Sequence, residues 1–262
     1  MTSPRSGLPG RGVISIEENR SPGKLPGSNP DTKGSDVTIS TILFDAGDIL
    51  YSKPHREGAV AAFLVERGLE APKKPDPVAK KIRLDAHAGD FSEHELFERL
   101  LAHYGVTDPK DMADGVTLLH AQQRDIVFFD GVPETLHELK RRGFMLGIVT
   151  NTYNSKAEKY EWFRVVGIDT VWDSYANSCD LRIIKPDPAI YLAALEPLGV
   201  DPVDGAFVGH AQIELNGAKA IGMTTIMFNP DPDCVKADHK IERFSGLLNV
   251  PAIVAATAAP TR

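Results

Sequence analysis

Two carboxylates follow an apolar run near residue 45. The stretch "TILFDAGDIL" (41–50) has Asp45 directly after the apolar residues and Asp48 three positions later. A carboxylate just past a buried strand has a fixed backbone and one free side, which suits in-line attack on a substrate. Asp45 is therefore a candidate nucleophile. The alternative is that Asp45 only caps a turn or a helix.

Three other segments carry polar side chains where an apolar run ends. Thr150 and Asn151 follow "FMLGIVT", Lys185 lies in "IIKPDPAIY", and His210 and Glu214 lie in "VGHAQIELNGA". Ligands of open α/β sheets bind beyond the carboxyl ends of the strands, so these segments are expected to converge. A carboxylate, a hydroxyl and an ammonium together suit an anionic substrate. Taken singly, Thr150 could equally bond to backbone and Lys185 could be a solvated surface lysine.

The elements that must position these groups alternate from residue 37 onward. Short apolar runs alternate with helix-length amphipathic stretches, a pattern typical of βα units in a parallel sheet. In 133–143, Leu136 and Leu139 share a helical face, and Gly143 stands where a helix end favours positive φ. The sequence predicts an α/β fold with a doubly wound, Rossmann-like parallel sheet. The predicted strands are 37–44, 144–150, 205–209 and 224–228, with a helix in "NGAKAIGM" before the last.

The chain divides into three predicted parts. Residues 1–36 are rich in Gly, Pro and Ser and read as a disordered tail. Residues 37–53 and 128–262 form the α/β core. The helical stretches of 54–127 are far longer than a crossover between parallel strands requires, which predicts an inserted helical cap. The stripe Phe91, Leu96, Phe97, Leu100 and Leu101 is expected to be the core of this cap.

Composition excludes several classes of function. The 262 residues carry a net charge of −7 without a basic stripe, so nucleic acid is not an expected partner. Cys179 and Cys234 lack neighbours at metal-ligand spacing, which argues against zinc or a disulfide framework and favours a reducing, cytoplasmic location. No apolar run is long enough to span a membrane. No feature of the sequence indicates an oligomeric state.

Together, the four polar segments resemble the haloacid dehalogenase superfamily. The resemblance covers roughly residues 39 to 250 and rests on "ILFDAGDIL", "GIVTNT", "KPDPAIYLAAL" and "FVGHAQIELNGAKAIGM", in this order. The position of the helical insertion resembles the helical-cap subclass. The resemblance implies that Asp45 attacks the substrate to form a covalent aspartyl ester. It also implies that Thr150 and Lys185 hold the transferring group.

The chain departs from the family pattern at two places. The position of the usual second aspartate, the general acid and base, is Gly47. Asp48 could substitute for it or could bond within the turn. Where family phosphatases complete a Mg²⁺ site with an acid, this chain has His210, a poor replacement for a hard ion's oxygen ligand. The metal set that the resemblance implies is Asp45, the Gly47 backbone and Glu214, and Mg²⁺ affinity is expected to be low.

The role of His210 stays open between a ligand for a softer metal, a base for ester hydrolysis and a packing residue. The dehalogenase branch also lacks the second aspartate and retains the later acid, as here with Glu214. However, it has a hydroxyl at the position of Ile49 and Ser and Asn in the fourth motif, so neither branch is matched fully.

Three functions fit these residues. The first is a hydrolase that acts through an aspartyl ester at Asp45 on a small anionic metabolite, phosphorylated or otherwise activated. The second is a non-hydrolytic protein that binds an anionic ligand or performs different chemistry on it. The third is a structural or regulatory protein. Substrate choice is assigned to the cap and its junctions, where Tyr51, His55, Arg56 and Arg124 are candidate substrate-binding residues or ordinary surface. Asn151, after the second strand, is a further candidate substrate-binding residue.

Overall fold

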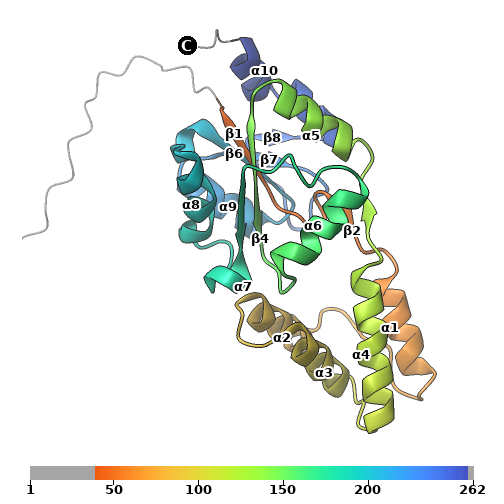
Figure 1. The fold of residues 1–262 in the computed structure, drawn as a ribbon. Coiled ribbons are helices and arrows are strands. Elements are labelled where there is room, and N and C mark those ends of the chain that lie inside the picture. Colours follow the sequence, from red (N-terminus) through yellow and green to blue (C-terminus); the bar gives the residue numbers. More distant parts are fainter. Residues whose placement is uncertain (1–38, 259–262) are drawn as a thin grey trace, which may run out of the picture. The chain divides into compact units, whose positions relative to one another are not determined.

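The structure, a computed structural model, describes residues 39–258. The predicted tail 1–36 lies outside these residues. A six-stranded sheet has the order β5-β4-β1-β6-β7-β8, and every neighbouring pair is parallel (Figure 1). This confirms the predicted α/β fold. The strands are β1 (Thr41–Phe44), β4 (Met145–Thr150), β5 (Ser174–Asn177), β6 (Gly205–Gly209), β7 (Thr224–Met227) and β8 (His239–Lys240).

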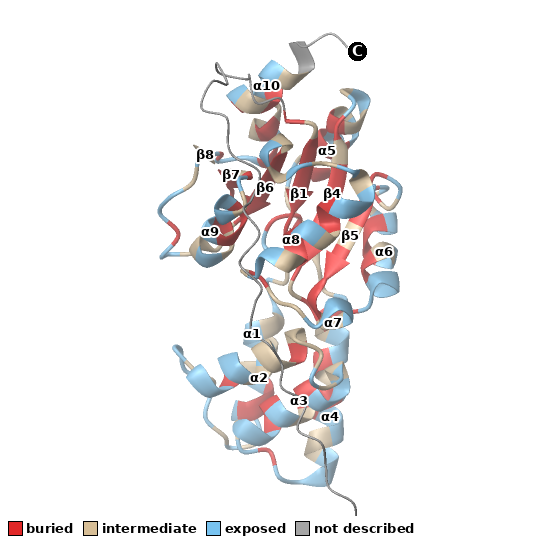
Figure 2. Ribbon diagram, turned by 90° about the vertical axis from the view of Figure 1, so that its left-hand side faces the viewer, coloured by how far each residue is buried: buried red, intermediate tan, exposed pale blue. Residues whose placement is uncertain are grey.

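Alternating side chains of the central strand divide the core into two layers. Ile42 and Phe44 of β1 pack on one face of the sheet, and Leu43 packs on the other. Both faces are covered, which is why β1 and β6 are fully buried and β4, β5 and β7 are buried along most of their length (Figure 2). The first face is covered by α5 (Val132–Arg141), α6 (Lys156–Val165), η3 (Phe244–Asn249) and α10 (Pro251–Ala258), and the second by α8 (Pro188–Leu195) and α9 (Gln212–Ala220).

The predicted strands agree with the observed ones to within a few residues. The observed β6 coincides with the predicted 205–209, whereas β1 begins at Thr41, several residues later than predicted. Gly143 has φ +91° just past α5, as expected for a helix end. The short connecting helices are α7 (Ser178–Leu181), η1 (Glu196–Leu198) and η2 (Pro202–Asp204).

A separate group of helices lies between β1 and α5 in sequence. They are α1 (Arg56–Val65), α2 (Pro77–His87), α3 (Glu93–His103) and α4 (Pro109–Gln123). We call α1–α4 the helical unit. Its own apolar cluster contains Leu96, Phe97, Leu100 and Leu101, with Phe91 packed against it, as the sequence predicts. Its action as a cap over the site stays a prediction.

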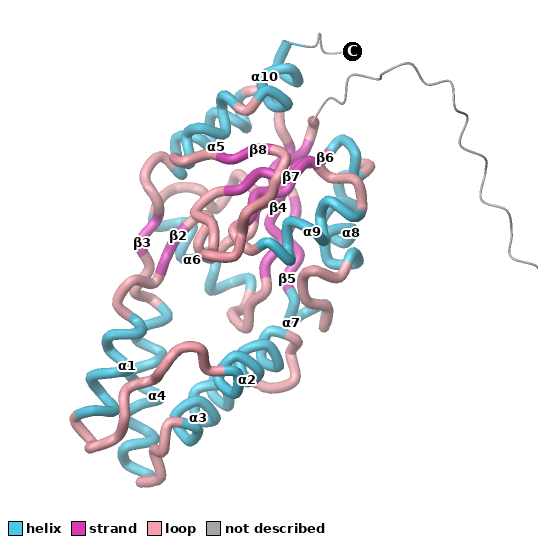
Figure 3. The backbone as a smooth tube through the Cα atoms, turned by 180° about the vertical axis from the view of Figure 1, so that it is seen from behind, coloured by secondary structure: helices cyan, strands magenta, loops and turns pink. Residues whose placement is uncertain are grey.

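A two-stranded antiparallel ladder joins the helical unit to the sheet. The ladder pairs β2 (Tyr51–Ser52) with β3 (Val127–Phe128), so both crossings between the helical unit and the core lie side by side (Figure 3). Within residues 39–258, no helix has both the length and the apolar character needed to cross a bilayer.

Candidate active site

Asp45 lies at the carboxyl end of β1. Its backbone N–H donates to the carbonyl of Val208 on β6, which fixes the residue at the sheet edge. One carboxylate oxygen, Oδ1, accepts the N–H of Ala46 at 2.7 Å. Only 6% of the residue is exposed, so its remaining oxygen faces a nearly closed site.

Lys185 supplies the ammonium of the site. Its side chain is fully buried, and Nζ lies 2.8 Å from Asp45 Oδ2 and 2.8 Å from Glu214 Oε2. Nζ and Oε2 are nevertheless without a directed hydrogen bond, so these contacts are charge pairs at hydrogen-bond distance with imperfect angles. Burial by itself lowers the pKa of Lys185. The negative charges of Asp45 and Glu214 have the larger, opposite effect, so the pKa of Lys185 lies above its ordinary value.

Asn151 aligns the lysine with Glu214. Its Oδ1 accepts the backbone N–H of Lys185 at 2.9 Å, and its Nδ2 lies 3.5 Å from Glu214 Oε1. Glu214 sits in the first turn of α9, and the hydroxyl of Tyr191 donates to its backbone carbonyl at 2.8 Å. Burial and the nearby Asp45 charge raise the pKa of Glu214, against the opposing effect of Lys185.

His210 bridges two carboxylates. Nε2 lies 3.5 Å from Asp45 Oδ2, and Nδ1 lies 3.1 Å from Asp231 Oδ1. Burial lowers the pKa of His210, but the hydrogen bond and charge of Asp45, together with Glu214 and Asp231, raise it to about 9. Burial also disfavours ionised Asp45, yet Lys185 and His210 hold the pKa of Asp45 well below its usual value. The Asp45 carboxylate and the His210 imidazolium therefore stabilise each other's charge.

The donors of this cluster do not fit Mg²⁺. Ligand atoms of Asp45, His210 and Glu214 lie within 4.8 Å of one another, as a metal site requires. However, the Lys185 ammonium lies between the two carboxylates, 2.8 Å from an oxygen of each. Mg²⁺ takes oxygen ligands at about 2.1 Å in an octahedron, and one of the three donors here is imidazole. Two cationic side chains already balance the carboxylates without an ion.

Gly47 and Asp48 form the turn that follows Asp45. Asp48 has φ +58°, its N–H donates to the carbonyl of Tyr51, and its own carbonyl accepts Nδ2 of Asn229 at 2.9 Å. These contacts support the interpretation of Asp48 as a turn residue. A Cβ on Gly47 would meet nothing within 4 Å, so the missing side chain leaves open space in the turn after Asp45.

The remaining predicted residues differ in their relation to this cluster. Thr150 is buried at the carboxyl end of β4, the strand next to β1. Tyr51 packs in the apolar core, and its hydroxyl accepts from Lys159, while Arg56 bonds Tyr153. Arg124 is exposed at the end of α4, and no contact among the described residues joins it to Asp45. His55 is exposed and pairs with Asp125.

Sequence reasoning missed Asp231 and Lys159. Asp231 follows β7 at the same sheet edge, so the strand-end rule applied to "TTIMFNPD" identifies it. Lys159 lies on the buried face of α6 with Trp162 and Phe163, at helical spacing i, i+3, i+4. Helical periodicity assigns position 159 to the buried face, and a lysine at such a position is the sequence feature that could have identified Lys159.

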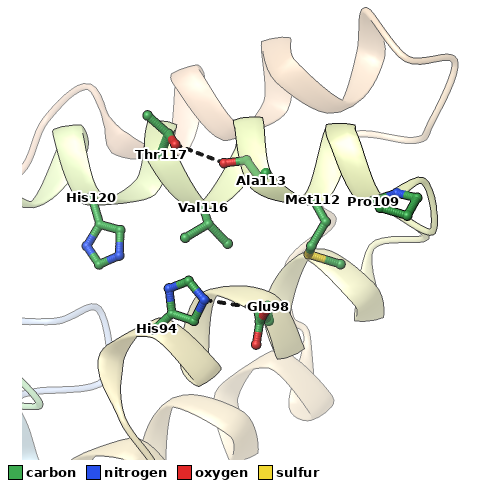
Figure 4. A pocket seen from close by; sticks show the side chains of 8 residues that line it. All are labelled: His94, Glu98, Pro109, Met112, Ala113, Val116, Thr117 and His120. Atoms are coloured by element: carbon green, nitrogen blue, oxygen red, sulfur yellow. Dashed lines mark hydrogen bonds and ion pairs between the residues drawn. The ribbon is translucent and has the colours of Figure 1, made fainter.

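The helical unit contains a hollow of its own. It lies between α3 and α4, and no residue of the Asp45 cluster lines it (Figure 4). His94 and Glu98 face it from α3, and Met112, Val116 and His120 face it from α4. This hollow does not bear on the chemistry at Asp45.

Comparison with known proteins identifies phosphatases and dehalogenases as relatives. A glyceraldehyde 3-phosphate phosphatase of Methanopyrus kandleri is 28% identical over 231 residues, covering 81% of this chain and 97% of that protein. (S)-2-haloacid dehalogenase 4A of Burkholderia cepacia is 29% identical over 152 residues, covering 56% of this chain and 64% of that protein. The solved 2-haloacid dehalogenase of Pseudomonas syringae superposes with a TM-score of 0.59 at 24% identity, covering 84% of this chain and all of that one.

The family pattern described as haloacid dehalogenase-like hydrolase matches residues 85–228, more than half of the chain. With the parallel sheet and the cluster at its carboxyl edge, this match shows that the chain belongs to the haloacid dehalogenase-like hydrolases.

Proposed function

We propose that the chain hydrolyses a small anionic metabolite through an ester at Asp45, without a metal ion and with His210 moving the protons. One observation carries the proposal: Oδ2 of Asp45 contacts both the Lys185 ammonium and the His210 ring. Nucleophile, balancing cation and proton donor thus meet at one atom. Lys185 and Thr150 would bind the transferring group, and the helical unit would close over it.

In the first step, a carboxylate oxygen of Asp45 attacks the phosphorus or carbon of the substrate and displaces the leaving group. His210 is protonated in the free enzyme, since its pKa of about 9 lies above neutral pH. It can therefore give its proton to the departing oxygen, the task that a second aspartate performs in the family pattern. Asp231, 3.1 Å from Nδ1, holds the ring in place.

In the second step, water cleaves the ester and restores the carboxylate of Asp45. Esterification neutralises Asp45, which is the strongest of the groups that raise the pKa of His210. Burial then favours the neutral ring, which can accept a proton from water as the water attacks. The same residue thus acts as acid and then as base, and the charge of Asp45 determines which.

The relatives support the substrate class. One is named for a phosphate monoester and the other for a haloacid, both of them small anions. The buried Lys185 ammonium and the partly buried His210 imidazolium suit such a group.

A non-hydrolytic protein that holds an anionic ligand is the second candidate. The observation that favours it is the state of the Asp45 carboxylate. Oδ1 accepts a backbone N–H and Oδ2 contacts two cations, and the low pKa lowers its nucleophilicity. In such a protein the cluster would bind the ligand without forming an ester.

Detection of the ester by mass spectrometry tests the proposal. Wild-type protein, His210→Asn and Asp45→Asn are mixed with glyceraldehyde 3-phosphate, p-nitrophenyl phosphate or (S)-2-chloropropionate in EDTA and quenched with acid. With p-nitrophenyl phosphate and (S)-2-chloropropionate, whose leaving groups need no proton, we expect an adduct on the peptide containing residue 45, most abundant in His210→Asn because water attack is slowed. With glyceraldehyde 3-phosphate the same variant should form less adduct than wild type, because its leaving group lacks a proton donor. No adduct is expected in Asp45→Asn. Turnover that persists in Asp45→Asn, or binding without an adduct or product, would refute the hydrolase mechanism.

A further inference from the structure

Three cationic side chains near the β2–β3 ladder are bonded only to neutral groups. Lys53 follows β2, Arg56 begins α1, and Lys159 lies on α6. We call Lys53, Arg56 and Lys159 the junction cations. Among the described residues, none of the three lies within ion-pair distance of a carboxylate, unlike Lys185 in the candidate active site.

Lys159 is the most deeply buried of the junction cations. Only 3% of the residue is exposed, and Nζ donates to the hydroxyl of Tyr51 at 2.7 Å. A buried ammonium without a counter-charge is costly, and burial lowers the pKa of Lys159 to about 8. The charges of Asp45 and Lys185 also act on it, so Lys159 lies within electrostatic range of the candidate nucleophile.

Lys53 and Arg56 join the helical unit to the core through neutral groups. Lys53 donates to the side-chain carbonyl of Gln123 at the end of α4, and Nη1 of Arg56 donates to the hydroxyl of Tyr153 at 2.9 Å. Gln123 Nε2 also donates to that hydroxyl, at 2.9 Å. Tyr153 belongs to the segment that follows β4, whereas Gln123 belongs to the helical unit. An anion at this point would therefore contact both parts.

Two glutamates whose charges act on Lys53 form hydrogen bonds with other groups. Glu93 and Glu158 act on Lys53 at longer range. Glu93 accepts Nδ2 of Asn154 at 3.2 Å and faces His120, and Glu158 accepts the N–H of Ser155 in the capping box of α6. Burial and repulsion from Arg56 and Lys159 lower the pKa of Lys53 to about 7. Lys53 and Lys159 thus have only neutral groups as direct hydrogen-bond partners, and a bound anion would raise their pKa values and keep both protonated.

We infer that the junction cations bind a second anionic group of the substrate, while its reacting group lies between Asp45 and Lys185. The term substrate rests on the proposed function, whereas the binding of the anionic group by the junction cations does not. The preferred ligand class is then a small molecule with two anionic groups, such as a phosphate and a carboxylate on a short chain. The second group supplies the counter-charge that the junction cations lack and brings the helical unit and core together.

Equilibrium binding to Asp45→Asn tests the inference without turnover. Calorimetry measures Kd for carboxyalkyl phosphates with one, two or three methylenes, each beside the alkyl phosphate of equal length that lacks the carboxylate. We expect at least one carboxylated member to bind 10-fold or more tightly than its partner. Adding Lys159→Met or Lys53→Met should abolish this preference. Lys53→Met should also change the affinity for alkyl phosphate less than 2-fold.

Lys156→Met is the matched control, because Lys156 is an exposed lysine on the same helix as Lys159. It should retain the preference. A lack of carboxylate preference in Asp45→Asn at every chain length, with a native circular dichroism spectrum, would overturn the inference. So would equal loss of both ligands in Lys53→Met. This experiment measures binding and not turnover, so it tests the junction cations separately from the proposed function. If the protein shows the carboxylate preference but no hydrolase activity, the inference stands and the proposed function fails.

Discussion

Nε2 of His210 lies 3.5 Å from Oδ2 of Asp45, the atom that also contacts the Lys185 ammonium. The family pattern implies an acid of a metal site at position 210, and the chain has a cation there instead. A buried carboxylate between two cations needs no further positive charge to stay ionised. The proposed mechanism relates the two departures from the family pattern, Gly47 and His210: one imidazole would serve as both the acid–base group and the balancing charge.

The charge of Asp45 should control the ionisation of His210. The pKa of His210 is about 9, with Asp45 as the largest stabilising influence. Asp45→Asn removes that charge, so we expect the pKa to fall by at least one unit because burial and the remaining cation then dominate. NMR titration of the His210 ring protons measures the change. An unchanged pKa in Asp45→Asn would rule out the acid-to-base exchange that we propose.

Activity should fall at alkaline pH. The first step needs ionised Asp45 and protonated His210. The lowered pKa of Asp45 keeps it ionised at mildly acid pH, and the raised pKa of His210 keeps it protonated up to about pH 9. We therefore expect kcat/KM to decline as pH rises through about 9. Asp231→Asn removes one charge that raises this pKa, so its decline should begin at lower pH. Identical profiles for Asp231→Asn and wild type would contradict this assignment.

Metal chelation should leave the activity intact. Lys185 already lies between the two carboxylates that a cation would use, so we expect turnover in EDTA to stay within 2-fold of the value in millimolar Mg²⁺. Loss of turnover in EDTA, restored by Mg²⁺, would contradict the metal-free site.

The double variant Gly47→Asp/His210→Asp tests whether restoring two acids to the site creates a Mg²⁺ site. A side chain at position 47 meets no atom within 4 Å at its Cβ, so an aspartate can be accommodated there. Both substitutions add oxygen ligands, and we expect calorimetry to detect Mg²⁺ binding that wild type lacks. Gly47→Ala/His210→Asn is the control and should not bind Mg²⁺. Equal Mg²⁺ affinity of wild type and the double aspartate variant would argue against the role assigned to His210.

The main features of the fold were predictable because apolar periodicity reports burial directly. The strand β6 coincides with its prediction, since "GAFVG" is a short apolar run with turn residues on both sides. The strand β5 (SYAN) was missed because it is short and largely polar, and β8 because it has two residues. Their pairing depends on neighbouring strands, which local sequence does not report.

The site was predictable as a set of segments but not as a charge network. The strand-end rule and the family resemblance select Asp45, Lys185 and Glu214, and the structure joins them by direct contacts. The partner of His210 depends on a loop 21 residues away, and the position of Lys159 depends on which face of α6 is buried. Both are properties of tertiary packing.

Removal of the Lys185 charge should destabilise the protein at neutral pH. Lys185→Met leaves Asp45 and Glu214 buried beside each other, and breaking a buried pair in this way costs about 3–5 kcal/mol. The loss should shrink as pH falls and the carboxylates take up protons, because their pKa values rise without the lysine. Urea unfolding at pH 7 and pH 5 measures both effects.

Lys219→Met, which removes an exposed pair with Asp238, is the control and should cost less than about 1 kcal/mol. Equal losses in the two variants would contradict the network.

The close approach of α9 to the segment after Lys185 should tolerate no side chain at Gly217. A Cβ there would lie 2.7 Å from the carbonyl oxygen of Pro186 and 2.8 Å from its Cβ. Gly217→Ala must therefore push the helix that carries Glu214 away from the loop that carries Lys185, at a cost of about 1–3 kcal/mol. Urea unfolding and kcat measure the two consequences, and we expect both to fall. Gly58→Ala on α1 has open space at its Cβ and should gain up to about 1 kcal/mol with unchanged activity. Equal stability and equal kcat of Gly217→Ala and Gly58→Ala would contradict this interpretation. The contact between α9 and Pro186 would then not be needed to position the Lys185 ammonium beside Asp45 and Glu214.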